Sequence, residues 1–198
     1  TIWDIWQNLD VTEPEDADLR CYAAQAARAR DGDAALAAAK PLWFTGKATP
    51  DACDPVFTAL MATGAISVAD RWARYRLALE AGGFRLAQQV AGGLPASDRL
   101  GAGEFQRIDA RPVDELARGN FRWKARDGRE LALYALERAA RADPEDARSG
   151  WIRWRERLPA QDRAWGDARL AYHASRALLP WANAAWREPL PAEMSAEM

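Results

Sequence analysis

The stretch that decides the fold runs from residue 42 to residue 57 and reads LWFTGKATPDACDPVF. It predicts the end of one helix, a stiff connector and the start of the next helix. Gly46 can adopt the left-handed conformation that closes a helix. Pro50 fixes φ inside the connector, and Asp54 followed by Pro55 is typical of an N-cap and a first helical position. The stretch therefore predicts a joint between two helices whose apolar ends face each other.

The composition favours an all-α fold. A chain of 198 residues can form one sizeable domain with a core. Hydrophobic residues make up 49%, and many of them are alanine, the best helix former. No stretch alternates polar and apolar residues over the length of a strand. The net charge of −2 gives no electrostatic case for nucleic acid, and no apolar run approaches the ~20 residues of a membrane span.

Start and stop signals divide the rest of the chain into further helices. After a short amphipathic turn at residues 2–6, the expected helices cover residues 15–30, 34–44, 54–63, 68–81, 84–91, 97–108, 113–117, 129–142, 144–158, 161–178 and 181–187. Pro41 lies inside the second of these and is expected to kink or split it. Helical pairs begin about every 30–35 residues, the period of an α-solenoid. We therefore predict a right-handed α-solenoid of antiparallel helical hairpins, with residues 1–198 forming part of one superhelical domain.

Cys21 and Cys53 are the only cysteines. In a reducing compartment they would be buried thiols. In an oxidising one they could close a loop and stabilise the fold by roughly 3–4 kcal/mol in the loop-entropy model. The residues alone leave both alternatives open.

Few residues in the sequence indicate nucleophilic catalysis or metal binding. His173 is the only histidine, and it is far in the sequence from both cysteines. A Cys–His nucleophile is therefore formally possible but disfavoured, and one histidine makes no metal motif. We predict a histidine that packs between helices, with no metal and no cofactor.

Two kinds of side chain, the tryptophans and the basic residues, could contribute to binding a partner. The chain has ten tryptophans, which we interpret mainly as core residues, with stacking on sugar rings as the alternative. Basic residues form two clusters, Arg71, Arg74, Arg76 and Arg85, and Arg118, Arg122, Lys124, Arg126 and Arg129. We interpret both as solvated faces; the alternative is contact with an anionic polymer or a partner domain.

The sequence also resembles a known family. The run LRCYA at residues 19–23 and the pattern LWxTGKxxPxACDxxF at residues 42–57 are similar to the superhelical, non-catalytic part of soluble lytic murein transglycosylases. The likeness continues more loosely at residues 77–82 and at Leu94-Pro95, and in character at residues 151–165. Members usually lack a proline at the position of Pro41. The resemblance favours a disulfide between Cys21 and Cys53.

The resemblance implies a periplasmic parent enzyme. Such enzymes cleave the β-1,4 bond between N-acetylmuramic acid and N-acetylglucosamine without hydrolysis, giving a 1,6-anhydro product, and need no metal or cofactor. Expected partners are peptidoglycan glycan strands, the catalytic domain of the same parent and other cell-wall proteins. Because the chain has no initiator methionine or signal segment, we expect a processed protein or a piece of a longer one.

The catalytic part of that family is expected to lie elsewhere. Its catalytic glutamate precedes a serine, and no Glu-Ser dipeptide occurs in this sequence. We therefore assign no catalytic residue and expect the lysozyme-like domain to be absent from the chain. The alternative function is a free-standing α-solenoid adaptor that binds proteins.

Overall fold

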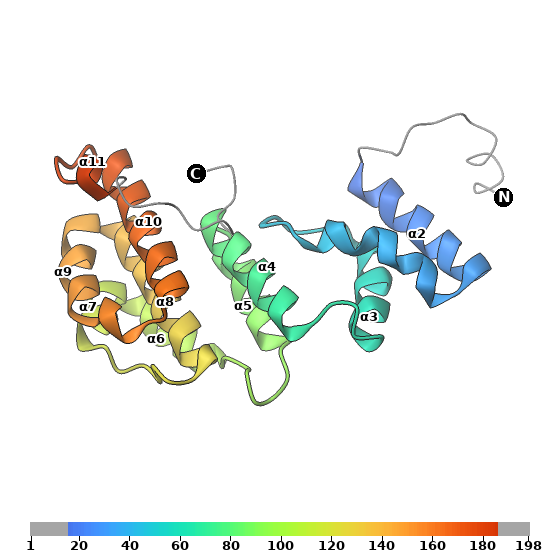
Figure 1. Cartoon of the computed structure of the whole chain (residues 1–198), viewed down its shortest axis with the longest axis horizontal. Helices are drawn as coiled ribbons and strands as arrows, with labels where there is room; N and C mark the ends of the chain where they lie inside the picture. The colour runs from blue at the N-terminus through green and yellow to red at the C-terminus, as the bar shows by residue number, and fades with distance from the viewer. Residues whose placement is uncertain (1–15, 186–198) are drawn as a thin grey trace. The chain divides into compact units, whose positions relative to one another are not determined.

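The computed structural model describes residues 16–185, and within that range the backbone forms helices and turns and no strand. This confirms the predicted all-α class. The chain divides into two units, residues 1–90 and 91–198 (Figure 1). The expected turn at residues 2–6, the first residue of the helix predicted at 15–30 and the end of the last predicted helix lie outside the described residues.

The first unit begins with a capped helix and continues through two 3₁₀ segments. Its elements are α2 (Ala17–Asp31), η1 (Asp33–Trp43), η2 (Asp51–Cys53), α3 (Asp54–Ala62), α4 (Val68–Glu80) and all but the last two residues of α5 (Phe84–Gly92). Asp16 caps α2 by accepting the backbone N–H of Asp18 at 2.8 Å. Ser67 and Asp70 form a reciprocal capping box at the start of α4.

The segment that contains Pro41 is a 3₁₀ helix rather than the kinked α-helix predicted from the sequence. Proline cannot donate a helical hydrogen bond, and its ring clashes with the carbonyl four residues earlier in an α-helix. The three-residue period of the 3₁₀ helix aligns Leu36 with Ala39, and both are buried. Because α2 and α3 both contact η1, this line of side chains faces the core of the unit.

The joint at residues 42–57 connects the helices of the first unit through Trp43 and Gly46, and the role of Gly46 differs from the one predicted. Trp43 is buried, packs edge-on against Phe57 at 5.1 Å, and donates its indole N–H to the Asp70 carbonyl at 2.9 Å. Gly46 does not adopt the predicted left-handed conformation. It is required for space instead, because a Cβ at this position would overlap the Leu77 carbonyl in α4.

A disulfide joins Cys21 in α2 to Cys53 at the end of η2, with their Cα atoms 5.0 Å apart. Both residues are fully buried among Leu36, Val56 and Leu60. The bond therefore ties the first helix of the unit to the joint. Asp54 is helical rather than an N-cap because η2 leads directly into α3.

The second unit is built around α8. Its elements are α6 (Ala102–Ala110), α7 (Pro112–Arg118), α8 (Arg126–Ala142), α9 (Pro144–Trp154), η3 (Arg155–Arg157), α10 (Ala160–Arg176) and α11 (Ala182–Ala185). Helix α8 contacts α6, α7, α9 and α10, and residues 131–137 are all buried, so it is covered on every side.

Three helix boundaries in this unit differ from the predicted positions by three residues or more. The helix expected from residue 97 begins at Ala102, after a turn. Helix α8 begins three residues early, at Arg126, where Asp127 accepts the backbone N–H of Gly128 and the guanidinium of Arg122. Helix α9 ends at Trp154 and continues as a 3₁₀ turn to Arg157.

Removing the disulfide should destabilise the first unit. For the double substitution Cys21→Ser and Cys53→Ser we expect the free energy of unfolding to fall by about 3–4 kcal/mol, because a loop with a sequence separation of 32 residues is no longer closed in the unfolded chain. Urea titration followed by circular dichroism measures this loss. Reductant present throughout should weaken the wild type by the same amount and leave the double variant unchanged. A wild-type transition that does not respond to reductant would contradict the prediction.

Candidate functional site

A buried ion pair joins α8 to α10. The Arg169 guanidinium donates to both carboxylate oxygens of Glu137, from Nε at 2.8 Å and from Nη2 at 2.7 Å. His173 Nε2 lies 2.8 Å from Glu137 Oε1. The arginine and glutamate side chains are each 1% exposed, so water contributes almost nothing to their solvation. We call Glu137, Arg169 and His173 the α8–α10 lock.

The charge of Glu137 is set by two opposed effects. Burial by itself raises the pKa of this carboxyl, but the hydrogen bonds and positive charge of Arg169 and His173 outweigh it, and the pKa lies below its usual range. A glycosidic general acid requires the reverse, a carboxyl that stays protonated near neutral pH. We therefore interpret the lock as an ion pair that orients α10 against α8.

The structure confirms that His173 packs between helices. It is 8% exposed and contacts Glu137 across the α8–α10 interface. The alternative Cys–His nucleophile is wrong, because both cysteines are joined in the disulfide. Within residues 16–185, no three His, Cys, Asp or Glu side chains converge as metal ligands.

The first basic cluster is only partly a solvated face. Arg74 is buried, contrary to the prediction, and its guanidinium lies 4.3 Å from the centre of the Trp43 ring. It also donates to the Thr49 hydroxyl at 3.1 Å. Burial lowers the pKa of Arg74, although Asp54 partly opposes this. Arg71 and Arg76 are half-buried, and Arg85 is exposed.

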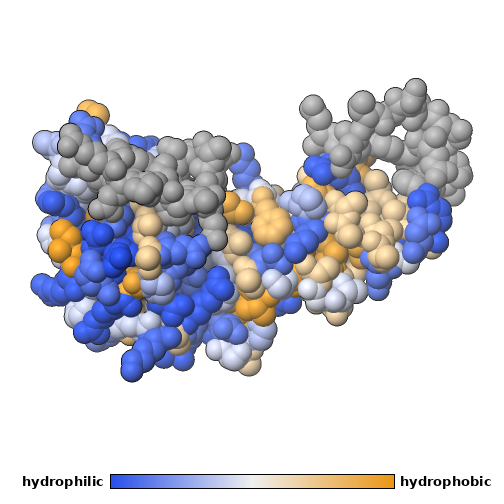
Figure 2. Space-filling view, viewed as in Figure 1, coloured by the Kyte–Doolittle hydropathy of each residue, from blue (hydrophilic) through white to orange (hydrophobic). Residues whose placement is uncertain are grey.

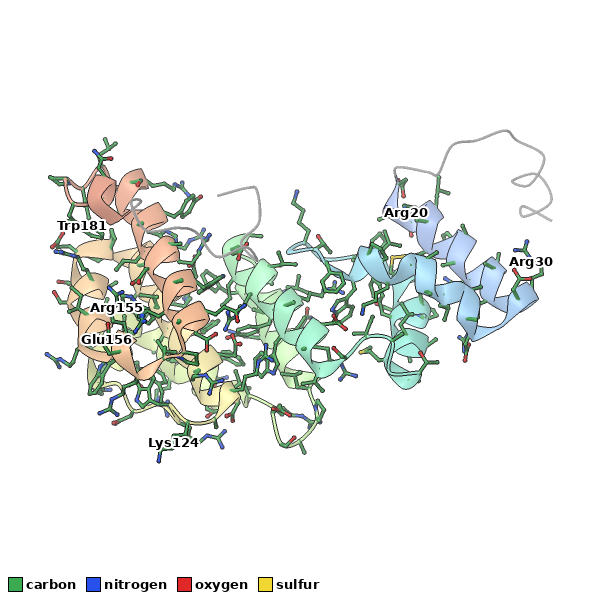
Figure 3. The ribbon with its side chains drawn as sticks, viewed as in Figure 1. Arg20, Arg30, Lys124, Arg155, Glu156 and Trp181 are labelled. Carbon is green, nitrogen blue, oxygen red and sulfur yellow. A yellow bond between two sulfur atoms is a disulfide. The ribbon has the colours of Figure 1, made fainter. Side chains whose placement is uncertain are left out.

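Ion pairs within the chain occupy most of the second cluster. Four arginines bind acidic side chains of α7, α8 or α10. The pairs are Arg118–Glu115, Arg122–Asp127, Arg126–Glu130 and Arg129–Asp162. Their main role is to fix the loop between α7 and α8 and to join α8 to α10. Lys124 is exposed and forms no ion pair with any described residue; Figure 3 shows its side chain projecting from the edge of the second unit.

The described tryptophans separate into two groups. Trp43, Trp72, Trp151 and Trp165 are buried, as the core interpretation predicts. Trp123, Trp154 and Trp181 are half-buried. The first two of this second group stack on each other with their ring centres 6.0 Å apart and their planes 27° apart.

The Trp123–Trp154 stack closes the loop that follows α7. Trp154 donates its indole N–H to the Ala117 carbonyl at 3.2 Å, and Trp123 donates to the Gly119 carbonyl at 3.0 Å. Arg157 lies over the Trp154 ring, 4.8 Å from its centre. Sequence reasoning missed this stack, because the two tryptophans are 31 positions apart and no local pattern links them.

None of the helices in residues 16–185 is both long enough and apolar enough to cross a membrane.

Comparison with known proteins identifies relatives by sequence. The soluble lytic murein transglycosylase of Salmonella typhimurium is 31% identical over 148 residues, which cover 72% of this chain and 23% of that protein. The protein of the same name from Escherichia coli K12 is 34% identical over 110 residues, 56% of this chain and 17% of that protein. The chain thus spans about a quarter or less of the curated relatives it matches. No family model matches it.

Solved structures of lytic transglycosylases share the fold of this chain. An inactive variant of the lytic transglycosylase Slt from Pseudomonas aeruginosa matches 93% of this chain with a TM-score of 0.70 and 25% identity, over 30% of that protein. The 70 kDa soluble lytic transglycosylase Slt70 from Escherichia coli matches 97% with a TM-score of 0.66 and 24% identity, over 33% of that protein. Together with the helical content, these matches confirm the predicted α-solenoid class.

Breaking the α8–α10 lock should cost more than breaking an exposed ion pair. For Glu137→Gln we expect a loss of about 3 kcal/mol or more in the free energy of unfolding, because Arg169 is left buried without a counter-charge. The matched control is Glu156→Gln, which removes an exposed partner of Arg163 and should cost less than about 1 kcal/mol. Urea titration at neutral pH measures both. Equal losses would contradict the prediction.

The same pair of variants tests the pH dependence. Because the pKa of Glu137 is lowered on folding, its contribution is complete above the unfolded value of about 4.3 and disappears as the pH falls through the folded pKa. The difference in stability between wild type and Glu137→Gln should therefore shrink below about pH 4. A difference that stays constant from neutral pH into this acid range would show that the carboxylate is not the origin of the effect.

Gly119 should tolerate no side chain. Its φ of +65° disfavours alanine, and a Cβ there would overlap the Trp154 ring. We expect Gly119→Ala to cost about 2–3 kcal/mol, roughly 1 from the backbone and the rest from displacing the indole. Gly64→Ala is the control, because Gly64 has a φ of +76° with no atom within 4 Å of its Cβ position, so only the backbone cost remains. Urea titration should separate the two variants; equal costs would remove Trp154 from the explanation.

Proposed function

Since this chain is a relative of the soluble lytic murein transglycosylases in both sequence and fold, we propose that it is a scaffold segment of such an enzyme. The parent would cleave the bond between N-acetylmuramic acid and N-acetylglucosamine in peptidoglycan and release a 1,6-anhydromuropeptide. The observation that carries this proposal is a match that is broad on this chain, 93% at a TM-score of 0.70, and narrow on the relative, 30%. A match of this kind is typical of one part of a larger enzyme.

The side chains of the described residues support a structural role. Glu137 is a buried carboxylate with a lowered pKa, and it is bound to two neighbours, Arg169 and His173. Other buried acids, Glu115 and Asp127, are likewise bound to arginines. Acids held in this way fix the positions of helices and leave no proton for a glycosidic oxygen. We therefore assign catalysis to another domain of the parent and to no residue of this chain.

The disulfide supports a periplasmic location. Disulfides persist in oxidising compartments and are rare where glutathione and thioredoxin keep thiols reduced. The bond between Cys21 and Cys53 is fully buried in the core of the first unit, which suits a structural and not a catalytic disulfide. We propose that the parent works in the periplasm, where peptidoglycan and the catalytic domain are its partners.

The test compares this chain with the protein encoded by its complete gene. Each is incubated with purified peptidoglycan, and the soluble products are separated and weighed by mass spectrometry. We expect the full-length protein to release 1,6-anhydromuropeptides, which are lighter than hydrolysis products by one water, and the 198-residue chain to release none.

Two results would overturn the proposal. Product from the 198-residue chain would place catalysis within it. Failure of the full-length protein to release any anhydro product would favour the other function considered above, a helical adaptor that binds proteins.

A further inference from the structure

Three cations without an ion pair to a described residue lie next to the Trp123–Trp154 stack, one by contact with a ring and two by their place in the sequence. Lys124 follows Trp123 in the loop, Arg153 precedes Trp154 in α9, and Arg157 covers the Trp154 ring. All three cations are exposed, and none forms an ion pair with a described residue. We call these five residues the basic–aromatic edge.

The arginines and the lysine of the edge form no ion pairs with described residues, whereas other charged residues nearby do. Arg118 and Arg122 lie in the same region, but each is bound to a buried acid. The adjacent acid Glu156 is bound by Arg163 at 2.5 Å. After this pairing, positive charge is left in excess at the edge, although the whole chain has a net charge of −2. Figure 2 shows mostly hydrophilic residues on the lower part of the second unit, where Figure 3, in the same view, labels Lys124.

Contacts within the second unit restrain two of the three cations, Arg157 and Arg153. Arg157 is layered on Trp154, and Arg153 lies 3.4 Å from the Ala117 carbonyl, to which the Trp154 indole also donates. Fixed side chains lose less conformational entropy when they bind a ligand. The indoles are half-buried, and their faces are partly taken by each other and by Arg157, so the exposed ring edges are the apolar surface next to the cations.

We propose that the basic–aromatic edge binds a peptidoglycan strand, with the three cations on the carboxylates of its stem peptides and the exposed edges of the indoles beside its sugar rings. The inference rests on the proposed function for the identity of the polymer. Charge complementarity and the adjoining aromatic rings favour an anionic saccharide over an acidic protein, which would require no indole surface. The edge would hold the strand at the scaffold while bonds are cleaved in another domain.

The experiment measures co-sedimentation of the oxidised chain with purified, insoluble peptidoglycan. In the edge variant, Lys124→Gln, Arg153→Gln and Arg157→Gln are combined. The control variant combines Lys47→Gln, Arg85→Gln and Arg111→Gln, which remove one exposed lysine and two exposed arginines elsewhere. We expect the edge variant to bind about tenfold more weakly than wild type and the control to bind within about twofold. Circular dichroism must show the same helical content in all three.

Chemical changes to the probe add a second readout. Converting the carboxylates of the peptidoglycan to amides should weaken wild-type binding as much as the edge variant does. Polyglutamate, at the same carboxylate concentration, should compete poorly with soluble peptidoglycan fragments. Equal competition would show a general anion surface, suited to an acidic protein, and would overturn the saccharide assignment.

Three further outcomes would overturn the inference: no binding by wild type, equal binding by wild type and the edge variant, or equal weakening in the control. These are separable from the proposed function. If the full-length protein releases anhydromuropeptides while the edge variant binds like wild type, only this inference fails. If the edge behaves as expected and the full-length protein releases no anhydro product, only the proposed function fails.

Discussion

The second unit depends on a carboxylate that water cannot reach. Burying Glu137 without partners would cost several kcal/mol, so Arg169 and His173 must face it whenever the unit is folded. Those two residues are four positions apart and lie on one face of α10. The requirement therefore fixes both the rotation and the register of α10 against α8, which apolar packing between alanine-rich helices would specify only weakly.

The first unit meets the same need by covalent means. Its segment η1 cannot be a regular α-helix because of Pro41. The disulfide holds α2 against the joint, and Trp43 connects that joint to α4 through its hydrogen bond to Asp70. One unit thus uses a bond between sulfurs where the other uses a buried ion pair. Both devices fix the positions of neighbouring helices.

The sequence predicted what depends on local chemistry. Capping residues, prolines and helical periodicity placed most helices within a few residues, and the family resemblance paired the cysteines. The errors arose where distant residues decide the outcome. Gly46 is explained by the Leu77 carbonyl, 31 positions later, and Arg74 is buried because Trp43 and Phe57 provide a surface for it. The Glu137 network had a detectable signal, an acid within an apolar helix, but nothing local identified its partners.

Several arginines pack against aromatic rings between the alanine-rich helices. Alanine allows helices to approach closely but leaves gaps where they diverge, and large flat side chains fill such gaps. Arginine stacks on an aromatic ring at Trp43, Trp154, Tyr172 and Trp181. Where the stack is buried, as at Arg74, the guanidinium packs against the Trp43 and Phe57 rings in the core of the first unit. Where it reaches the surface, as at Arg157, the guanidinium lies over an indole while remaining exposed. Such a contact restrains the arginine before any ligand arrives, which would lower the entropic cost of binding the anionic polymer proposed above.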